Sequence, residues 1–485
     1  MAAKTHRTVW PLFSEPRSVA LILTIYCALH LILRLGLSPN YVSGEAVQVL
    51  FAQSARWGYR AGDPPLATWL SWIILQATGN SRAAFFLIEY AVMGTGLVAF
   101  FAAARMVLGD VKAAAMAALA PIATATAGYF AHMGDVVSVV STAMFAIFLW
   151  SALRVFTHGK AIDYLFLGLS MGLGFLSGPS FLVLPVAMIV ALLFVPSLMA
   201  HIRPVPIAGS ALLALLIAIP HLRWLSLQEG GLWSGLVTPQ QNTLIVVSSA
   251  LFPLLAIAPV LYARALSASR ASETDLIWLR FFSVAAAVSV LLNVCLYAAG
   301  MLPPPLMAAV MTLTLWFFMR VKLAAFSDRA HQLFAGIVFA LALASIGWQT
   351  YAYQSGAYAC RECSAYWYMP AYVRGLRNAG FNEGTIVADT VALGGNLRSA
   401  FPASRIVTPD AEPSTFGLPK NGQCLIVWEG RGEVPPAMSV YLRADLSANI
   451  SPAAPRGTID ARLLKSDGRF AAVRYILLPG SGACD

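Results

Sequence analysis

The 485 residues of the chain are 59% hydrophobic and only 11% charged. Since about a quarter of the residues of a soluble domain are charged, this composition excludes a protein that is soluble along its whole length. The formal net charge is +10, but the basic residues lie mostly in short loops between apolar runs. No cluster of bases alternates with aromatic residues, which argues against nucleic acid as a partner.

At the N-terminus, Lys4, Arg7 and Arg17 precede the apolar run 18–36, which is long enough to cross a bilayer. No convincing cleavage site of small residues follows this run. We therefore predict a retained first membrane helix and no cleaved signal peptide.

Apolar runs of spanning length recur as far as Tyr353 and predict about eleven transmembrane helices. With the N-terminus in the cytoplasm, Lys and Arg fall mainly on the inner loops, and an odd helix count sends the tail outside. We predict a multi-pass protein of the bacterial inner membrane with a periplasmic C-terminus; an endoplasmic reticulum membrane would satisfy the same topology. The predicted spans are 18–36, 83–106, 113–131, 136–154, 163–178, 180–199, 206–222, 243–263, 280–300, 304–320 and 332–353.

Two outer segments are long. The first, 37–82, predicts an amphipathic helix over 44–57 and a rigid turn at 62–65. A short apolar helix over 66–78 follows, and we expect it to lie in the membrane interface. The second, 221–243, is rich in Trp, Gln and Gly. Ordered polar loops on one face of a bundle are where a membrane enzyme keeps its chemistry.

After residue 353 the chain becomes richer in charge, Pro and Gly. The sequence predicts a transmembrane domain over 1–353 and a small extracytoplasmic α/β domain over 354–485. Short β-type runs separated by helical stretches such as 371–379 indicate this domain; the runs are 385–387, 405–407, 424–428 and 473–478.

Four of the six cysteines, Cys360, Cys363, Cys424 and Cys484, lie in this tail. An even number in an exported domain favours structural disulfides. The spacing of Cys360 and Cys363 leaves a redox pair or half of a zinc site open, although no thioredoxin-like context and no suitable histidines accompany them.

Two carboxylates in the first outer segment are candidates for catalysis. Glu45 lies at the start of the amphipathic helix and could act as a general base toward an acceptor. Alternatively, its negative charge could simply stabilise the N-terminus of the helix by interacting with the helix dipole. Asp63 precedes Pro64 and Pro65, which hold it in an extended conformation. It could bind a metal, a sugar hydroxyl or an acceptor amine, or it could serve only to form the turn or to cap the next helix.

Other ionisable groups near the outer face could bind substrate or phosphate, because such groups are costly at membrane depth and often functional. Glu89 lies inside the second predicted span and could face a cavity, whereas Arg34 is expected to snorkel to the interface. Arg223 is the best single phosphate candidate, with an interfacial anchor as the alternative. The candidates are Arg56, Arg60, Arg82, His132, Asp135, His221 and Arg223.

At these residues the chain resembles a known family. The stretches Gly44–Gln53, Trp57–Tyr59 and Asp63–Leu70 resemble the first outer loop of family 39 glycosyltransferases. These are membrane enzymes of the GT-C fold, related to protein O-mannosyltransferases and to the aminoarabinose transferase of lipid A. Further similarity lies at Asn80–Arg82, Met133–Asp135, Gly172–Pro185 and Val387–Phe401.

The resemblance implies a sugar donor on a polyprenyl phosphate, an acidic residue in the first outer loop that activates the acceptor, basic residues that hold the phosphate, and inversion at the anomeric centre. It implies no firm cofactor and leaves a divalent metal ion open. Two departures stand out. The family usually has Asp-Glu where this chain has Gly44-Glu45, and it often has a Lys where this chain has Gly178.

The sequence thus predicts an integral-membrane glycosyltransferase that modifies a lipid, glycan or protein outside the cytoplasm. The two departures keep an alternative open, namely a non-catalytic GT-C-like protein that binds lipid-linked sugar or scaffolds envelope assembly. A lipid transporter is disfavoured because no internal repeat is evident.

Overall fold

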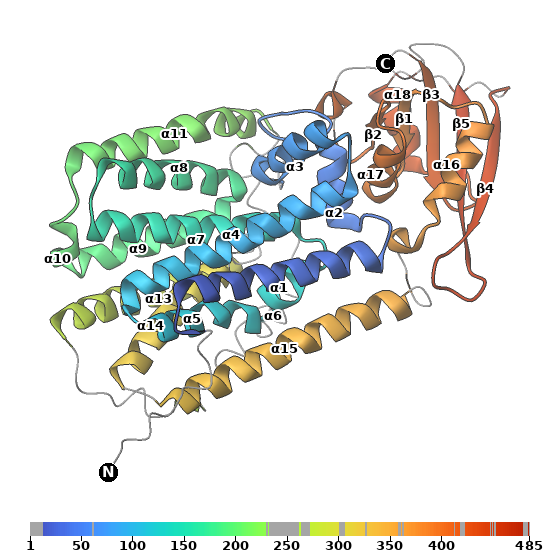
Figure 1. Ribbon diagram of the computed structural model, residues 1–485. Helices are drawn as coiled ribbons and strands as arrows, with labels where there is room; N and C mark the ends of the chain where they lie inside the picture. Colours follow the sequence, from blue (N-terminus) through green and yellow to red (C-terminus); the bar gives the residue numbers. More distant parts are fainter. Residues whose placement is uncertain are drawn as a thin grey trace. The chain divides into compact units, whose positions relative to one another are not determined.

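A computed structural model gives the structure of the chain (Figure 1). It describes residues 13–60, 63–228, 231, 261–262, 272–299, 306–324, 327–356, 360, 363–411, 413–417, 422–446, 448, 450, 453–478 and 484.

The described chain forms two compact units, each described here by itself. Unit 1 comprises 1–30, 90–131 and 137–346, and unit 2 comprises 31–89, 132–136 and 347–485. The division falls within α1 (Pro16–Leu37), α4 (Arg82–Leu108) and α15 (Asp328–Ser355), and after the first residue of α7 (Val136–Thr157).

Most of the chain is helical, as predicted from the apolar runs. Six helices in the described ranges are long and apolar enough to cross a membrane: α1, α4, α7 (Val136–Thr157), α11 (Pro204–Ser226), α13 (Glu273–Ala298) and α15. Shorter apolar helices are α8 (Ala161–Ser177), α9 (Val183–Leu193) and α14 (Leu306–Leu323). The predicted span 243–263, apart from residues 261 and 262, and the start of the span 304–320 lie outside the described residues.

Two predicted spans are interrupted. The span 113–131 divides into α5 (Val111–Leu119) and α6 (Ala125–Gly128), with a bend of 76° between the segments on either side of Thr124. Thr124 is extended and its side chain accepts a hydrogen bond from the Ala127 N–H, so it starts a new helix. Within the predicted span 180–199, α9 ends at Leu193 and a new short helix, α10, covers Pro196–Met199. The break arises because Pro196 disfavours the helical conformation at Val195.

Within unit 1, small residues let helices approach closely. A Cβ at Gly168 of α8 would lie 2.8 Å from the carbonyl oxygen of Ser210 in α11, and one at Gly96 of α4 would lie 2.7 Å from the Cα of Ala143 in α7. Such contacts are typical of membrane helix pairs, where packing replaces the hydrophobic effect as the source of stability.

The outer segment of unit 2 carries α2 (Ser43–Phe51) and α3 (Pro65–Thr78). The short helix α3 matches its predicted bounds within a residue. The amphipathic helix was predicted too long, because α2 ends at Phe51 and not at Trp57. The chain turns there, and the Gln53 side chain bonds to the Leu50 carbonyl and to the backbone of Ile406.

The C-terminal part of unit 2 contains a five-stranded sheet in the order β2-β1-β3-β5-β4 (Figure 1). β1 runs parallel to β2 and β3, whereas β5 is antiparallel to β3 and β4. The strands are β1 (Gly384–Ala388), β2 (Arg405–Val407), β3 (Gln423–Glu429), β4 (Arg456–Arg462) and β5 (Phe470–Leu478), and the helices are α16 (Met369–Asn378), α17 (Val391–Ala400) and α18 (Pro436–Ala444).

Strand β4 was not predicted. It pairs with β5 on one side only, and most of its residues are exposed or half-buried. Charged residues therefore occupy positions that would be apolar in a central strand, and the pattern gives no hydrophobic signal.

Candidate functional site

A buried ion pair joins the end of α1 to the start of α2 in unit 2. The Arg34 side chain is 3% exposed and that of Glu45 is 1% exposed. Arg34 donates from Nε to Glu45 Oε1 at 2.8 Å and from Nη2 to Glu45 Oε2. Arg34 Nη2 also donates to the Asn40 carbonyl at 3.1 Å. The expectation that Arg34 snorkels to the interface is therefore wrong, because its charge is neutralised inside the protein.

Glu45 has a second role at this point. Its Oε2 accepts the backbone N–H of Val42 at 2.9 Å, which satisfies one of the open donors at the start of α2. Both carboxylate oxygens of Glu45 are thus engaged, and neither is open to solvent.

Aromatic rings and a further acid surround the guanidinium. The centre of the guanidinium lies 4.5 Å from the Phe86 ring centroid and 5.6 Å from that of Tyr353. Glu89 is buried and interacts electrostatically with Glu45 and Arg34. Among the described residues, Nη1 of Arg34 has no hydrogen-bond partner.

The structure leaves no room for a side chain at position 44. A Cβ at Gly44 would overlap the carbonyl oxygen of Gly134. Gly134 has a φ of +92°, which favours glycine, and a Cβ there would meet the Val42 and Glu45 side chains. The backbone of 132–136 therefore occupies the space that a side chain at position 44 would need.

Side-chain amides fasten this outer segment to the C-terminal sheet region. Asn396 accepts the Tyr41 N–H at 2.9 Å and donates to the Tyr41 carbonyl at 3.0 Å. Asn40 donates to the carbonyls of Ser364 and Trp367 at 3.0 and 2.7 Å. The bonds from Asn396 satisfy the backbone N–H and carbonyl of Tyr41, which has no strand partner there. Together with the bonds of Asn40, they hold in place the loop that precedes Glu45.

Asp63 lies in a tight turn before α3. Its Oδ2 accepts from Arg60 Nε at 2.7 Å, and its backbone N–H donates to the Arg60 carbonyl at 2.9 Å. No side chain caps α3, so the helix-cap interpretation of Asp63 is wrong. The Asp63 side chain is 16% exposed.

The remaining basic candidates of the first outer segment differ in setting. Arg56 and Arg60 are exposed, and the Arg56 carbonyl accepts from the Trp69 indole at 2.7 Å. Arg82 donates to the carbonyls of Leu35 and Ser38, where its charge favours the C-terminus of α1. Burial raises the pKa of Tyr59 to about 12, which keeps this phenol as a donor to the Ser54 carbonyl.

His132 and Asp135 lie in the short segment before α7. His132 is buried, and Asp135 is exposed but interacts electrostatically with Glu89. This segment therefore joins Arg34, Glu45 and Glu89 in one polar group within unit 2.

His221 and Arg223 lie on α11 in unit 1. The segment from His221 to Ser226 is helical and not part of a loop as predicted, and most of the predicted loop 221–243 lies outside the described residues. His221 is buried against Trp224, with ring centroids 5.7 Å apart, whereas Arg223 is exposed.

The tail cysteines are paired as Cys360–Cys363 and Cys424–Cys484. Within the described ranges, no three His, Cys, Asp or Glu side chains are grouped as a metal site would require.

Sequence reasoning missed Arg34 and its anchors. A signal was present, since a charge three residues before the end of a spanning helix is a functional candidate by default. Nothing in the sequence pairs Asn40 with Trp367 or Tyr41 with Asn396, because these contacts join segments more than 300 residues apart.

Comparisons with known proteins bear on what this site does. Residues 62–224 match the sequence model of the dolichyl-phosphate-mannose-protein mannosyltransferase family. The lipopolysaccharide core galacturonosyltransferase RgtB of Rhizobium johnstonii is 26% identical over 458 residues, which are 88% of this chain and 91% of RgtB. RgtA of the same organism is 27% identical over 209 residues, but the match spans only 42% of RgtA.

The fold is similar to that of ArnT from Cupriavidus metallidurans in its apo crystal structure. The TM-score is 0.61 and the alignment covers 94% of this chain and 97% of ArnT, with 13% sequence identity. The predicted resemblance to family 39-type glycosyltransferases of the GT-C fold is therefore confirmed.

Proposed function

We propose that this GT-C-type glycosyltransferase moves a sugar from a polyprenyl-phosphate donor to a lipid, glycan or protein acceptor outside the cytoplasm. The similarity to RgtB carries the proposal, because it extends through the membrane helices and the C-terminal sheet region alike. The name of RgtB makes a hexuronic acid donor and a lipopolysaccharide core acceptor the first pair to test.

The topology that we propose has about eleven spans in a bacterial inner membrane. The N-terminus lies in the cytoplasm, and residues 354–485 form a periplasmic domain. The basic inner loops predicted from the sequence support this orientation, and the two disulfides of the tail support an oxidising compartment.

The reaction that we propose is a single displacement. The acceptor oxygen attacks the anomeric carbon of the donor sugar while the bond from that carbon to the phosphate oxygen breaks. A carboxylate takes the acceptor proton, polyprenyl phosphate leaves, and the anomeric centre inverts. Cationic side chains near the leaving group stabilise its charge.

Of the two predicted acids, Asp63 fits the role of base better than Glu45. A base needs an accessible oxygen with room for a proton. Asp63 is partly exposed and bonded through Oδ2, whereas both oxygens of Glu45 are bonded inside the protein. We assign Asp63 to proton transfer and Glu45 to holding the loop that carries it.

Exposed arginines are the candidates for binding the phosphate. In unit 2, Arg60 pairs with Asp63, and Arg56 lies in the same outer segment. In unit 1, Arg223 offers an exposed guanidinium at the end of α11 and is a separate candidate. Arg82 is committed to carbonyl groups of α1 and would shape the site more than bind substrate. We also propose His132, Asp135 and His221 for substrate contact: His132 and Asp135 lie in the polar group of Arg34, Glu45 and Glu89 in unit 2, and His221 lies two residues before Arg223 on the same helix in unit 1.

A non-catalytic role remains the second candidate. One observation favours it: the space for an acid at position 44 is filled by the backbone of Gly134. A protein of this kind would still bind lipid-linked sugar, but replacing Asp63 would leave its cellular phenotype unchanged.

The deciding experiment is transfer of radiolabelled hexuronic acid from polyprenyl phosphate to lipopolysaccharide core in membranes that contain the full-length protein. Loss of the base in Asp63→Asn is expected to lower the rate about 10²–10⁴-fold. Asp460→Asn is the matched control, because Asp460 also pairs with an arginine, Arg431, at 2.9 Å in an exposed position. A rate for Asp63→Asn within about threefold of that control would reject Asp63 as the base.

A further inference from the structure

The two disulfides of unit 2 lie in different settings. Cys360 and Cys363 are separated by two residues and are half-buried. Cys424 and Cys484 are 60 positions apart in the sequence, and each is 1% exposed within the core of the sheet region.

A cation lies beside the first pair. Arg469 Nη1 lies 3.7 Å from Cys360 Sγ, and Arg469 Nη2 lies 3.9 Å from Cys363 Sγ. The guanidinium thus reaches both sulfurs. A positive charge at this distance stabilises the thiolate that forms when the disulfide opens.

The two pairs also differ in what they contribute to the fold. A disulfide restricts the unfolded chain more when it closes a longer loop, so the pair that closes two residues contributes less than the pair that closes a long one. Partial exposure and a stabilised thiolate are typical of disulfides that exchange with other thiols.

The first pair is directly connected to the anchor of the outer segment. Cys363 begins the turn 363–367, whose carbonyls at Ser364 and Trp367 accept the hydrogen bonds of Asn40. The carbonyl of Asn40 in turn accepts from Arg34, the partner of Glu45. Opening the disulfide frees one end of this turn, and its effect reaches the loop of the candidate site through two hydrogen-bonded residues.

We propose that Cys360–Cys363 is a thiol–disulfide exchange site whose partner is the dithiol of an external oxidoreductase. A thiolate of the partner attacks one sulfur, the Cys360–Cys363 bond breaks, and the leaving thiolate is held by Arg469. The second thiolate of the partner then resolves the mixed disulfide. Two electrons and two protons reach this chain as two thiols, and the partner leaves as a disulfide.

Graded dithiothreitol, applied to the full-length protein in detergent, tests the proposal. After each reduction step the thiols are alkylated, and peptide mass spectrometry reads each pair separately. We expect Cys360–Cys363 to open at a dithiothreitol concentration at least about tenfold lower than Cys424–Cys484. Opening of both pairs over the same range would overturn the proposal.

Accessibility alone could produce that difference, and Arg469→Gln separates the two causes. This variant keeps the size of the side chain roughly but removes the charge, so reduction of Cys360–Cys363 should require roughly threefold or more additional dithiothreitol. Arg431→Gln is the control, since Arg431 pairs with Asp460. Equal behaviour of Arg469→Gln and Arg431→Gln would also overturn the proposal.

The link to the outer segment has its own measurement, which does not depend on the proposed reaction. Hydrogen exchange of residues 38–54 is expected to accelerate when only Cys360–Cys363 is reduced. The double variant Cys360→Ser with Cys363→Ser should show the same acceleration without reductant. Unchanged exchange in both conditions would show that the site, even if it exchanges, is not coupled to the loop.

Discussion

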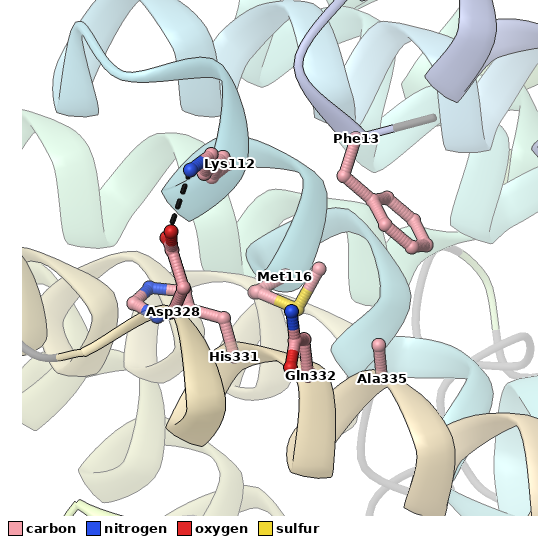
Figure 2. A pocket seen from close by; sticks show the side chains of 7 residues that line it. All are labelled: Phe13, Lys112, Met116, Asp328, His331, Gln332 and Ala335. Carbon is pink, nitrogen blue, oxygen red and sulfur yellow. Dashed lines mark hydrogen bonds and ion pairs between the residues drawn. The ribbon is translucent and has the colours of Figure 1, made fainter. Parts of the chain in front are cut away.

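Two ion pairs in different regions of the molecule show how burial decides what a charge pair does. The side chains of Arg34 and Glu45 in unit 2 are 3% and 1% exposed. Those of Lys112 and Asp328 in unit 1 are 36% and 52% exposed, with Lys112 Nζ 2.8 Å from Asp328 Oδ1. Figure 2 shows the second pair among the residues that line a pocket, which Phe13 and Met116 also line. The first pair is enclosed by the protein, and the second is screened by solvent.

The chemistry of the two cations matches these settings. A guanidinium can bond to both carboxylate oxygens and still donate elsewhere, as Arg34 does to Asn40. An ammonium is strongly hydrated and suits an exposed position such as that of Lys112. The buried pair therefore fixes a loop, whereas the exposed pair adds little beyond the packing around it.

The largest effect is expected for Arg34→Ala, which would leave the Glu45 charge buried without its partner. The free energy of unfolding should fall by about 3–5 kcal/mol. Thermal unfolding in detergent measures this effect. As a control, Arg34→Met with Glu45→Leu removes both charges and should recover most of the loss, and an equal loss in the double variant would contradict the burial argument.

A smaller effect is expected for Gly44→Ala, because the added methyl meets the Gly134 carbonyl. Overpacking of this kind costs about 1–3 kcal/mol. Gly36→Ala in α1 is the matched control, since no described atom lies within 4 Å of a Cβ built there. It should be neutral or slightly stabilising, as Ala favours helix over Gly. The two variants can be compared by their unfolding midpoints. Similar values would show that the backbone of 132–136 moves and makes room for the added methyl group.

Asn396→Ala should cost about 1–2 kcal/mol, because it leaves the N–H and carbonyl of Tyr41 without their partner. The loss should be local, so hydrogen exchange of residues 38–54 should rise more than exchange in β3. Uniform acceleration across unit 2 would indicate that the outer segment and the sheet region unfold together.

The smallest effect is expected for Lys112→Ala, which removes the exposed pair. The cost should be within about 0–1 kcal/mol and should shrink as salt is added. Unfolding midpoints at low and high ionic strength measure both. A loss comparable to that of Arg34→Ala would break the comparison between the two pairs.

The membrane helices and most strands of the sheet could be predicted, because their signals are local. Apolar runs of spanning length gave the starts of α1, α4 and α7 within two residues, and the short strands β1 and β3 lay within a residue of their predicted bounds. Errors occurred where a local signal was absent or misleading. The charged residues of β4 gave no hydrophobic signal for a strand. The continuous apolar run 113–131 predicted one helix, although the chain breaks at Thr124.

The sequence by itself determined that this protein belongs in a membrane, that its C-terminal part contains α/β structure, and that the chain resembles the GT-C glycosyltransferases. These conclusions rest on composition, periodicity and short motifs, which are properties of neighbouring residues. Only the tertiary structure decided that Arg34 is buried with Glu45, that Gly134 fills the space at Gly44, and that Arg469 reaches both sulfurs of Cys360–Cys363. Each of these contacts joins residues that are distant in the chain, and no local pattern encodes such a distance.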